Sequence, residues 1–290
     1  MIKNKIEYIA FLFFIQITRL FGINRLKYFA KIVAAIFFNV LKIRRKVVLN
    51  NLKAAFPVLS DRQIYDLAYK NYYSFAITLL EMMLVPYISR QVLHERIECV
   101  NLNLVREKFN EGNGVVLLTA HFGNWELGGA SVSSQLGIPF HVLAKPQRNS
   151  YMTKWLKMSR ERFGSKEILL GMSVRDLYSA IKEKNIVGVV GDQRGPKDGP
   201  RVKFFEQMTA TFGGVASIAL KTNTPVLMSM IVRQPDGIYK AYFEEISFTE
   251  INGTDEEKII AFNQKYMNIL EKYVREYPEQ WFWMHKIWKY

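Results

Sequence analysis

Short apolar runs alternate with helical patterns in the second two-thirds of this chain, and this alternation restricts the fold more than any other feature. The strand-like runs cover 114–119, 140–143, 186–190, 226–232 and 239–246. Helical patterns between them cover 151–163, 213–220 and a stretch after Ser173, with Asp176 as its capping partner. This order predicts an α/β domain with a mostly parallel mixed sheet flanked by helices. Its ligand crevice is expected at the carboxyl ends of the strands.

The first 45 residues carry the features of a membrane-associated helical region. Tyr8 to Thr18 is strongly apolar, but it is shorter than the ~20 residues that a spanning helix needs. Residues 26–41 carry lysines among apolar side chains, which suits a helix lying in the membrane interface. No small-residue cleavage site follows, so we expect this region to be retained. The alternative is that both segments are ordinary core helices of a helical subdomain.

Three parts are expected along the chain: a membrane-associated helical anchor (1–45), a helical lead-in (46–95) and an α/β domain (96–290). Pro57 ends one helix, and the next runs from 61 to about 85. Capping-box signatures stand at the starts of two long helices: Ser60 with Gln63, and Thr254 with Glu257.

The stretch most informative about function is GVVLLTAHFGNWELGG, residues 114–129. His121 stands just past the end of its strand, and Glu126 lies in or near the first turn of the next helix, where the helix dipole favours a carboxylate. A carboxylate can hold one imidazole N–H and fix the tautomer, which leaves the other nitrogen as a base. Such a base can take the proton from an alcohol that attacks an acyl carbonyl. The spacing alone is more often structural; the setting of strand end, turn and helix favours a site.

Two further positions are candidates for chemistry. Asp192 and Gln193 end the strand at 186–190, where an α/β sheet presents polar residues to its crevice, although a turn or capping role for Asp192 is an equal alternative. The residues that follow, 194–205, read as a loop. Arg160 lies in a basic helix and could bind a phosphate or steady an oxyanion. A solvated basic face is the simpler alternative for Arg160.

The charge of the chain indicates an acidic partner. A formal charge of +14 and a pI near 9.7 suit nucleic acid, an anionic membrane or an acidic protein equally. The aromatic residues gather in apolar runs near the termini rather than along one basic groove, which argues against nucleic acid. The single cysteine, Cys99, excludes an internal disulfide, and the four histidines have no metal-site spacing.

The segment HFGNWE, 121–126, resembles the catalytic block of the late acyltransferases of lipid A biosynthesis, a family of membrane-associated enzymes with a His-x4-Asp/Glu motif. Further blocks of the family resemble NLKAAFP (51–57), the Asp-Gln pair at 192–193 and the ending PEQWFWMHKIWKY (278–290). The resemblance therefore covers roughly residues 45 to 290. It implies His121 as general base and Glu126 as its orienter. Substrate-binding or site-shaping residues are implied at Arg160, Asp192, Gln193, Lys145 and Asn149.

This chain departs from the family pattern at two positions. Lys145 begins the segment KPQRN, where the family has Arg-Pro-x-x-Asn, so a point charge replaces a planar fork. Glu206 stands where the family usually has Gly, directly after the aromatic pair Phe204 and Phe205. This second departure falls at the backbone turn after the aromatic pair.

The resemblance implies an O-acyltransferase that moves a fatty acyl chain from an acyl carrier protein to a hydroxyl of a lipid A precursor in lipopolysaccharide biosynthesis. It places the enzyme on the cytoplasmic face of a bacterial inner membrane, with the anionic membrane and the carrier protein as partners, no nucleic acid, no metal and no cofactor. One alternative is acylation of another phospholipid or glycolipid, such as an acylated mannoside, from coenzyme A. A different class is a basic membrane scaffold or a nucleic-acid-binding protein.

Overall fold

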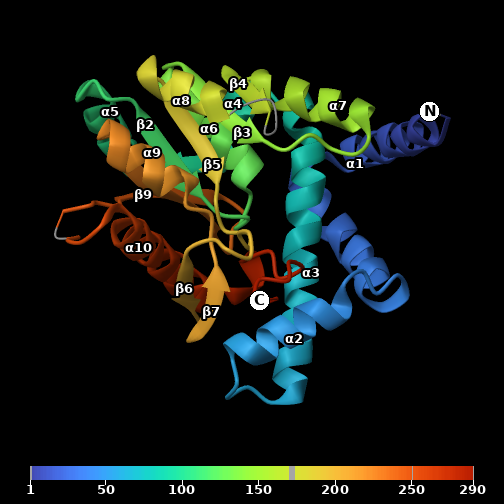
Figure 1. Cartoon of the computed structure of the whole chain (residues 1–290). Helices are drawn as coiled ribbons and strands as arrows, with labels where there is room; N and C mark the ends of the chain where they lie inside the picture. The colour runs from blue at the N-terminus through green and yellow to red at the C-terminus, as the bar shows by residue number, and fades with distance from the viewer. Residues whose placement is uncertain (1, 170–173, 250, 290) are drawn as a thin grey trace.

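The computed structural model describes residues 2–169, 174–249 and 251–289. In the order of the chain, a helical region comes first and a seven-stranded sheet follows (Figure 1). The helices of this first region are α1 (Ile2–Ala35), the π-helix Ile36–Val40, α2 (Arg45–Ala55), α3 (Asp61–Leu84), the short 3-10 helix Val85–Tyr87 and α4 (Arg90–Arg96). Both expected capping boxes are present, at Ser60–Gln63 before α3 and at Thr254–Glu257 before α10 (Asp255–Glu276). The expected helix start at Ser173 lies outside the described residues.

The main sheet is mixed and mostly parallel, as the sequence predicts. Its strands in spatial order are β1 (Ile97–Cys99), β9 (Tyr239–Glu245), β8 (Val226–Arg233), β2 (Val115–Thr119), β5 (Ile186–Val190), β3 (Phe140–Ala144) and β4 (Ser165–Leu169). The last five run parallel to one another, β9 is antiparallel to β8, and β1 is parallel to β9. β2 therefore lies in the centre, between β8 and β5.

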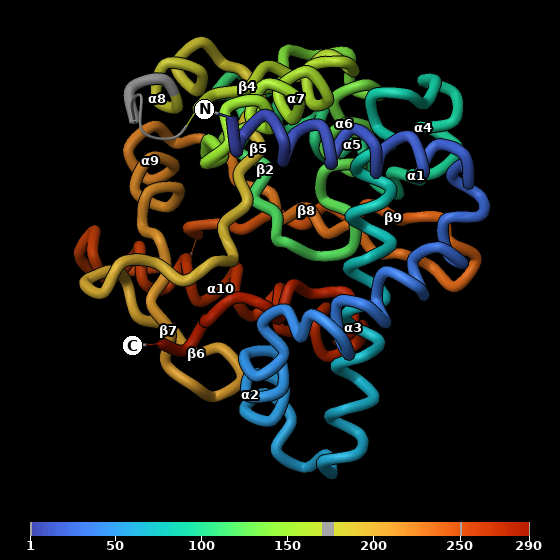
Figure 2. The backbone as a smooth tube through the Cα atoms, turned by 90° about the vertical axis from the view of Figure 1, so that its right-hand side faces the viewer, coloured from blue at the N-terminus to red at the C-terminus, as the bar shows by residue number. Residues whose placement is uncertain are grey.

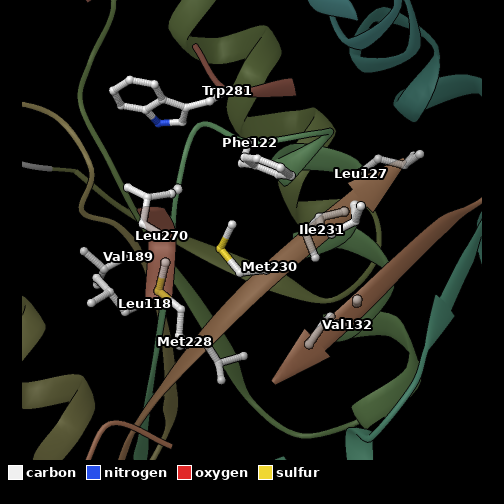
Figure 3. Close-up of a cluster of buried hydrophobic side chains, with 14 of the residues drawn as sticks. Leu118, Phe122, Leu127, Val132, Val189, Met228, Met230, Ile231, Leu270 and Trp281 are labelled. Atoms are coloured by element: carbon white, nitrogen blue, oxygen red, sulfur yellow. The ribbon is translucent and has the colours of Figure 1, made fainter. Parts of the chain in front are cut away.

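Short helices connect these strands: α5 (Leu102–Asn110), α6 (Trp125–Leu136), α7 (Ser150–Glu161), α8 (Val174–Lys182) and α9 (Gly214–Thr222). The two faces of the sheet are covered by different helices because alternate residues of a strand point to opposite sides. Ile231 of β8 contacts α6, whereas Met228 and Met230 lie on the other face with Leu270 of α10 (Figure 3). The central strands are thus buried on both faces.

The prediction of a loop over 194–205 was wrong in its second half. Residues Arg201–Phe204 and Gln207–Ala210 form an antiparallel hairpin, β6 and β7. Alternation of buried Val202 and Phe204 with exposed Lys203 is the strand signal that the preceding glycines and prolines obscured. Its two turn residues, Phe205 and Glu206, have φ values of 51° and 60°. Glu206 therefore occupies a left-handed conformation that glycine adopts more easily.

Helix α1 bends at Gly22, whose φ is 64°, so it consists of two arms, 2–21 and 23–35. Both arms lie on one face of the molecule, the face turned to the viewer in Figure 2. The second arm packs beside α3, and the first arm passes along α7. By length and composition, Ile2–Val40 is the one described helical stretch that could cross a membrane, and most of that stretch is not buried.

Candidate active site

His121 and Asp192 follow the neighbouring parallel strands β2 and β5, and the fold brings their side chains together. His121 Nδ1 lies 2.7 Å from Asp192 Oδ1, and the His121 backbone N–H donates to Asp192 Oδ2 at 2.9 Å. Trp281 Nε1 donates to that same Oδ2 at 2.8 Å. The carboxylate thus accepts three hydrogen bonds while only 3% of its side chain is exposed. This buried, fully bonded carboxylate fixes the orientation of the imidazole.

The charges of this pair stabilise each other. Burial opposes the imidazolium, but the charge and hydrogen bond of Asp192, together with the charge of Glu126, outweigh burial and raise the pKa of His121. Burial also opposes the carboxylate, yet His121 and the hydrogen-bond donors lower the pKa of Asp192. Because Nδ1 is engaged, Nε2 is the nitrogen left to act as a base, with the Gln193 amide nitrogen 3.5 Å away.

Helix α3 holds the loop that carries His121. Thr78 Oγ1 donates to the carbonyl oxygen of Gly123 at 2.7 Å, and Asn124 Nδ2 donates to Glu81 Oε2 at 2.9 Å. Asn124 also caps α6, since its Oδ1 accepts the Leu127 N–H. Only glycine fits at Gly123, where φ is 55° and an added Cβ would lie 1.8 Å from the Ile231 carbonyl oxygen. The loop is therefore fixed on both sides of this glycine.

The carboxylate of Glu81 is fully buried and belongs to a polar network that joins α3 to the sheet. Tyr239 Oη donates to Glu81 Oε2 at 2.6 Å, and the Arg233 guanidinium lies 3.4 Å from the Tyr239 oxygen and contacts Ser74. Burial raises the pKa of Glu81, while the positive charge of Arg233 opposes that rise. The network supports the His121 loop through Asn124.

The segment 277–288 closes the loop from a third side. Phe122 and Trp281 form an antiparallel bridge, the Gly123 N–H donates to the Gln280 carbonyl, and the Phe282 N–H donates to the His121 carbonyl at 3.0 Å. Trp281 is buried in the core. The Trp-rich ending is thus part of the site at Trp281.

Glu126 does not hold the imidazole, contrary to the expectation from the sequence. Its two carboxylate oxygens accept from Arg160 Nη2 at 2.6 Å and Nε at 2.9 Å, and Arg160 Nη1 donates to Glu167 at 2.6 Å. This geometry arises because the last turn of α7 carries Arg160, whose guanidinium fork pairs with the carboxylate in the first turn of α6. Arg160 is only 18% exposed, so it is not part of a solvated basic face.

An apolar cavity of about 90 Å³ lies between the sheet and α6. Residues from five parallel strands and from α6 line it, among them Leu117, Phe140, Gly188, Ile231, Trp125 and Gly129. Glu126 and Arg160 form part of the same wall. Trp125 also lines a small second cavity that contains His121, and its ring lies 4.8 Å from the imidazole. Trp125 therefore stands between His121 and the larger cavity.

The remaining predicted residues lie in different surroundings. Gln193 faces His121, as described. Lys145 is exposed just after β3 and does not line the cavity. Asn149 is buried but turned away from the site: it caps α7 through the Tyr151 N–H, and its Nδ2 donates to the Asn4 carbonyl at 2.9 Å. The structure therefore gives Asn149 a role in attaching α1.

Sequence reasoning missed the partners that lie far away along the chain. Asp192 was a candidate only for substrate binding or for shaping the site, because nothing local links it to a histidine 71 positions earlier; their strands pair only in the fold. Glu81 was missed as well. A lone carboxylate in the apolar half of the 61–85 helix was the signal that could have found it, since buried charges need partners.

The chain is similar to known bacterial acyltransferases along most of its length. The family model described as bacterial lipid A biosynthesis acyltransferase matches residues 3–290. The chain is 26% identical over 254 residues to a lipid A biosynthesis palmitoleoyltransferase of Escherichia coli K12, which covers 86% of this chain and 80% of the relative. It is 24% identical over 253 residues to the lauroyltransferase of that strain, with the same coverage. It is also 20% identical to a phosphatidylinositol mannoside acyltransferase of Mycolicibacterium smegmatis, over 77% of this chain and 72% of the relative.

Proposed function

Since the chain belongs to the bacterial lipid A biosynthesis acyltransferase family, we propose that it transfers a fatty acyl chain from an acyl carrier protein to a hydroxyl of a lipid A precursor. The observation that carries the proposal is a histidine oriented by a buried carboxylate, separated by one tryptophan from an apolar cavity. A base beside a cavity suited to a hydrocarbon chain is what acyl transfer to an alcohol requires.

In the proposed mechanism His121 acts as general base. Asp192 accepts the Nδ1–H, and Nε2 takes the proton of the acceptor hydroxyl as its oxygen attacks the thioester carbonyl. The tetrahedral intermediate collapses, the carbon–sulfur bond breaks, and Nε2–H returns the proton to the departing thiolate. An ester and a free thiol result, and His121 is regenerated as a neutral base.

Arg160 is proposed to stabilise negative charge beside the cavity. Three of its five N–H groups are used in the bonds to Glu126 and Glu167, so two remain for a substrate oxygen. The carboxylates hold the guanidinium in place before the substrate arrives, and preorganised donors of this kind contribute strongly to catalysis. Glu126 is thus proposed as a positioning residue for Arg160.

The charge and the surface of the chain support the proposed donor and location. An acidic carrier protein would be attracted to a chain with a net charge of +14. We propose the cytoplasmic face of the bacterial inner membrane as the site of action, supported by the exposed apolar residues of α1. A second candidate is acylation of another glycolipid, for which the similarity to the mannoside acyltransferase is the specific support.

The test is transfer by the purified full-length protein, read by mass spectrometry. Acyl-carrier-protein and coenzyme A thioesters are each offered with a lipid A precursor or a phosphatidylinositol mannoside. We expect product from the carrier-protein donor and the lipid A precursor, and His121→Ala should lower the rate ~10²–10⁴-fold. His141→Ala, a partly buried histidine on β3, serves as the matched control. Undiminished turnover in the His121 variant would exclude the mechanism, and product only from the mannoside would exclude the substrate.

A further inference from the structure

Helix α1 is apolar on two opposite sides, of which the protein covers only one. Toward the body it buries a row of residues: Ile15, Thr18, Leu26, Ala30, Val33 and Ala34. Away from the body, Ile9 is 65% exposed, Phe13 67% and Leu20 86%. A helix that is apolar all round is normally covered on every side, by protein or by lipid. The uncovered side therefore calls for an apolar partner.

The exposed side chains form one row on each arm. The row on the first arm has exposed residues at three- and four-residue intervals or their multiples: Ile2, Ile6, Ile9, Phe13 and Leu20. The row on the second arm repeats every four residues and continues into the π-helix: Tyr28, Ile32, Ile36 and Val40. We call these the first and second apolar rows. The bend at Gly22 leaves both arms on the same face of the molecule (Figure 2).

The first arm is attached to the catalytic domain near its beginning. The rings of Tyr8 and Tyr151 stack at 5.4 Å, Phe11 packs edge-on against Trp155 at 5.0 Å, and the Asn149 side chain bonds to the backbone of the arm. These partners all belong to α7 or to its cap. A first arm that crossed a bilayer would have to leave α7 and break every one of these contacts.

The second arm is attached in the same way. The Tyr73 hydroxyl donates to the Lys27 carbonyl at 3.3 Å, and Arg96 bonds to the Asn24 side chain. Exposed Lys27 and Lys31 stand next to the second apolar row. Long basic side chains beside an apolar row suit a helix in the headgroup region, where the stem lies in the apolar layer and the ammonium reaches the phosphates.

The charge around the rows selects the partner. Residues 1–46 contain ten lysines and arginines and a single acidic residue, Glu7. A second copy of this chain would bring the same positive charge to the contact, whereas an anionic bilayer provides the opposite charge. Phospholipid is therefore the occupant that satisfies both the apolar rows and the charge.

We infer that the two apolar rows form one membrane-binding face that lies flat in the surface of an anionic bilayer, so that α1 does not span it. This inference extends the membrane association of the proposed function, but it does not depend on the acyl chemistry. It keeps the beginning of α1 on the same side of the membrane as the catalytic domain.

The first experiment tests which side residue 3 occupies. Single cysteines replace Lys3 or the exposed Lys203 in a Cys99→Ser background, and each full-length protein is added to preformed phosphatidylglycerol–phosphatidylethanolamine vesicles. We expect a membrane-impermeant maleimide to label both positions equally before the vesicles are permeabilised. Protection of the Lys3→Cys protein with free labelling of the Lys203→Cys protein would show a span and overturn the inference.

The second experiment asks whether both rows bind lipid. Ile9→Glu/Phe13→Glu and Ile32→Glu/Ile36→Glu should each lower partitioning into these vesicles at least tenfold, and Met208→Glu, an exposed apolar residue on β7, should leave it unchanged. If only one of these two double substitutions lowers vesicle binding, the inference that both arms form the membrane-binding face is refuted. If the substitutions instead dissolve a dimer in analytical ultracentrifugation and leave vesicle binding intact, the occupant is a second copy. His121→Ala should bind vesicles normally, which separates this test from that of the catalytic proposal.

Discussion

Replacing Asp192 by asparagine should remove most of the activity while keeping the fold, because of the way its two oxygens are used. Oδ2 accepts from two fixed donors, the His121 backbone N–H and Trp281 Nε1. The amide oxygen of asparagine will therefore take the place of Oδ2. Its NH₂ group must then face His121 Nδ1, where the carboxylate Oδ1 stood at 2.7 Å.

An NH₂ group in that position reverses the tautomer of the imidazole. Nδ1 must accept a hydrogen bond, so the proton moves to Nε2, and Nε2 can no longer act as a base. In a serine protease, the corresponding aspartate-to-asparagine change lowers kcat by ~10⁴ for this reason. We expect a loss of roughly 10³–10⁴-fold for Asp192→Asn. The charge is lost as well, so the pKa of His121 should fall.

The assay is single-turnover acyl transfer followed by mass spectrometry, with unfolding monitored on the same samples. Asp198→Asn is the matched control, because Asp198 is exposed on the loop that follows Gln193. The control should retain full activity. An Asp192→Asn protein with activity within tenfold of the wild type, or one that is inactive only because it has unfolded, would refute the argument from the tautomer.

Three further outcomes follow from the structure. Because the pKa of His121 is raised and only the neutral ring is a base, kcat/KM should rise with pH and level off only above the ordinary value of 6.5; a plateau already reached by about pH 6 would contradict this. Glu81→Ala leaves the Asn124 amide without its buried acceptor and the buried Arg233 guanidinium without the nearby carboxylate. It should therefore lower the free energy of unfolding, measured by urea titration, by about 3–5 kcal/mol. A loss below about 1 kcal/mol would argue against the network. Glu206→Gly should raise Tm by about 2 °C by relieving a positive φ worth about 1 kcal/mol, and an unchanged or lower Tm would show that the turn is not strained.

The sheet could be predicted largely because its central strands are short, continuous apolar runs. β2, β5 and β8 are buried on both faces, so each run contrasts sharply with the polar residues beside it. β4 was not predicted because SKEIL alternates weakly, and β6 was hidden behind a segment rich in glycine and proline. Edge strands and short hairpins are stabilised by contacts with residues elsewhere in the chain, and the local sequence pattern does not contain those residues.

The position of His121, the proposed base, was predictable, but the identity of its carboxylate partner was not. His121 was placed at a strand end by the local run before it. The choice between Glu126 and Asp192 depends on which carboxylate the fold brings to Nδ1, and that in turn depends on the order of β2 and β5. Arg160 also keeps Glu126 from being that partner, because it donates hydrogen bonds to both carboxylate oxygens of Glu126.

The closure of the site by the segment 277–288 has a consequence for the time at which this protein becomes competent during synthesis. The base follows β2, its carboxylate follows β5, and the tryptophan that bonds this carboxylate is residue 281. The nascent chain can therefore complete the site only after nearly all of its described length has emerged from the ribosome. The arms of α1 emerge well before that point, because they precede these residues in the chain. Translation thus makes the proposed membrane-binding face available long before the geometry of the candidate site exists.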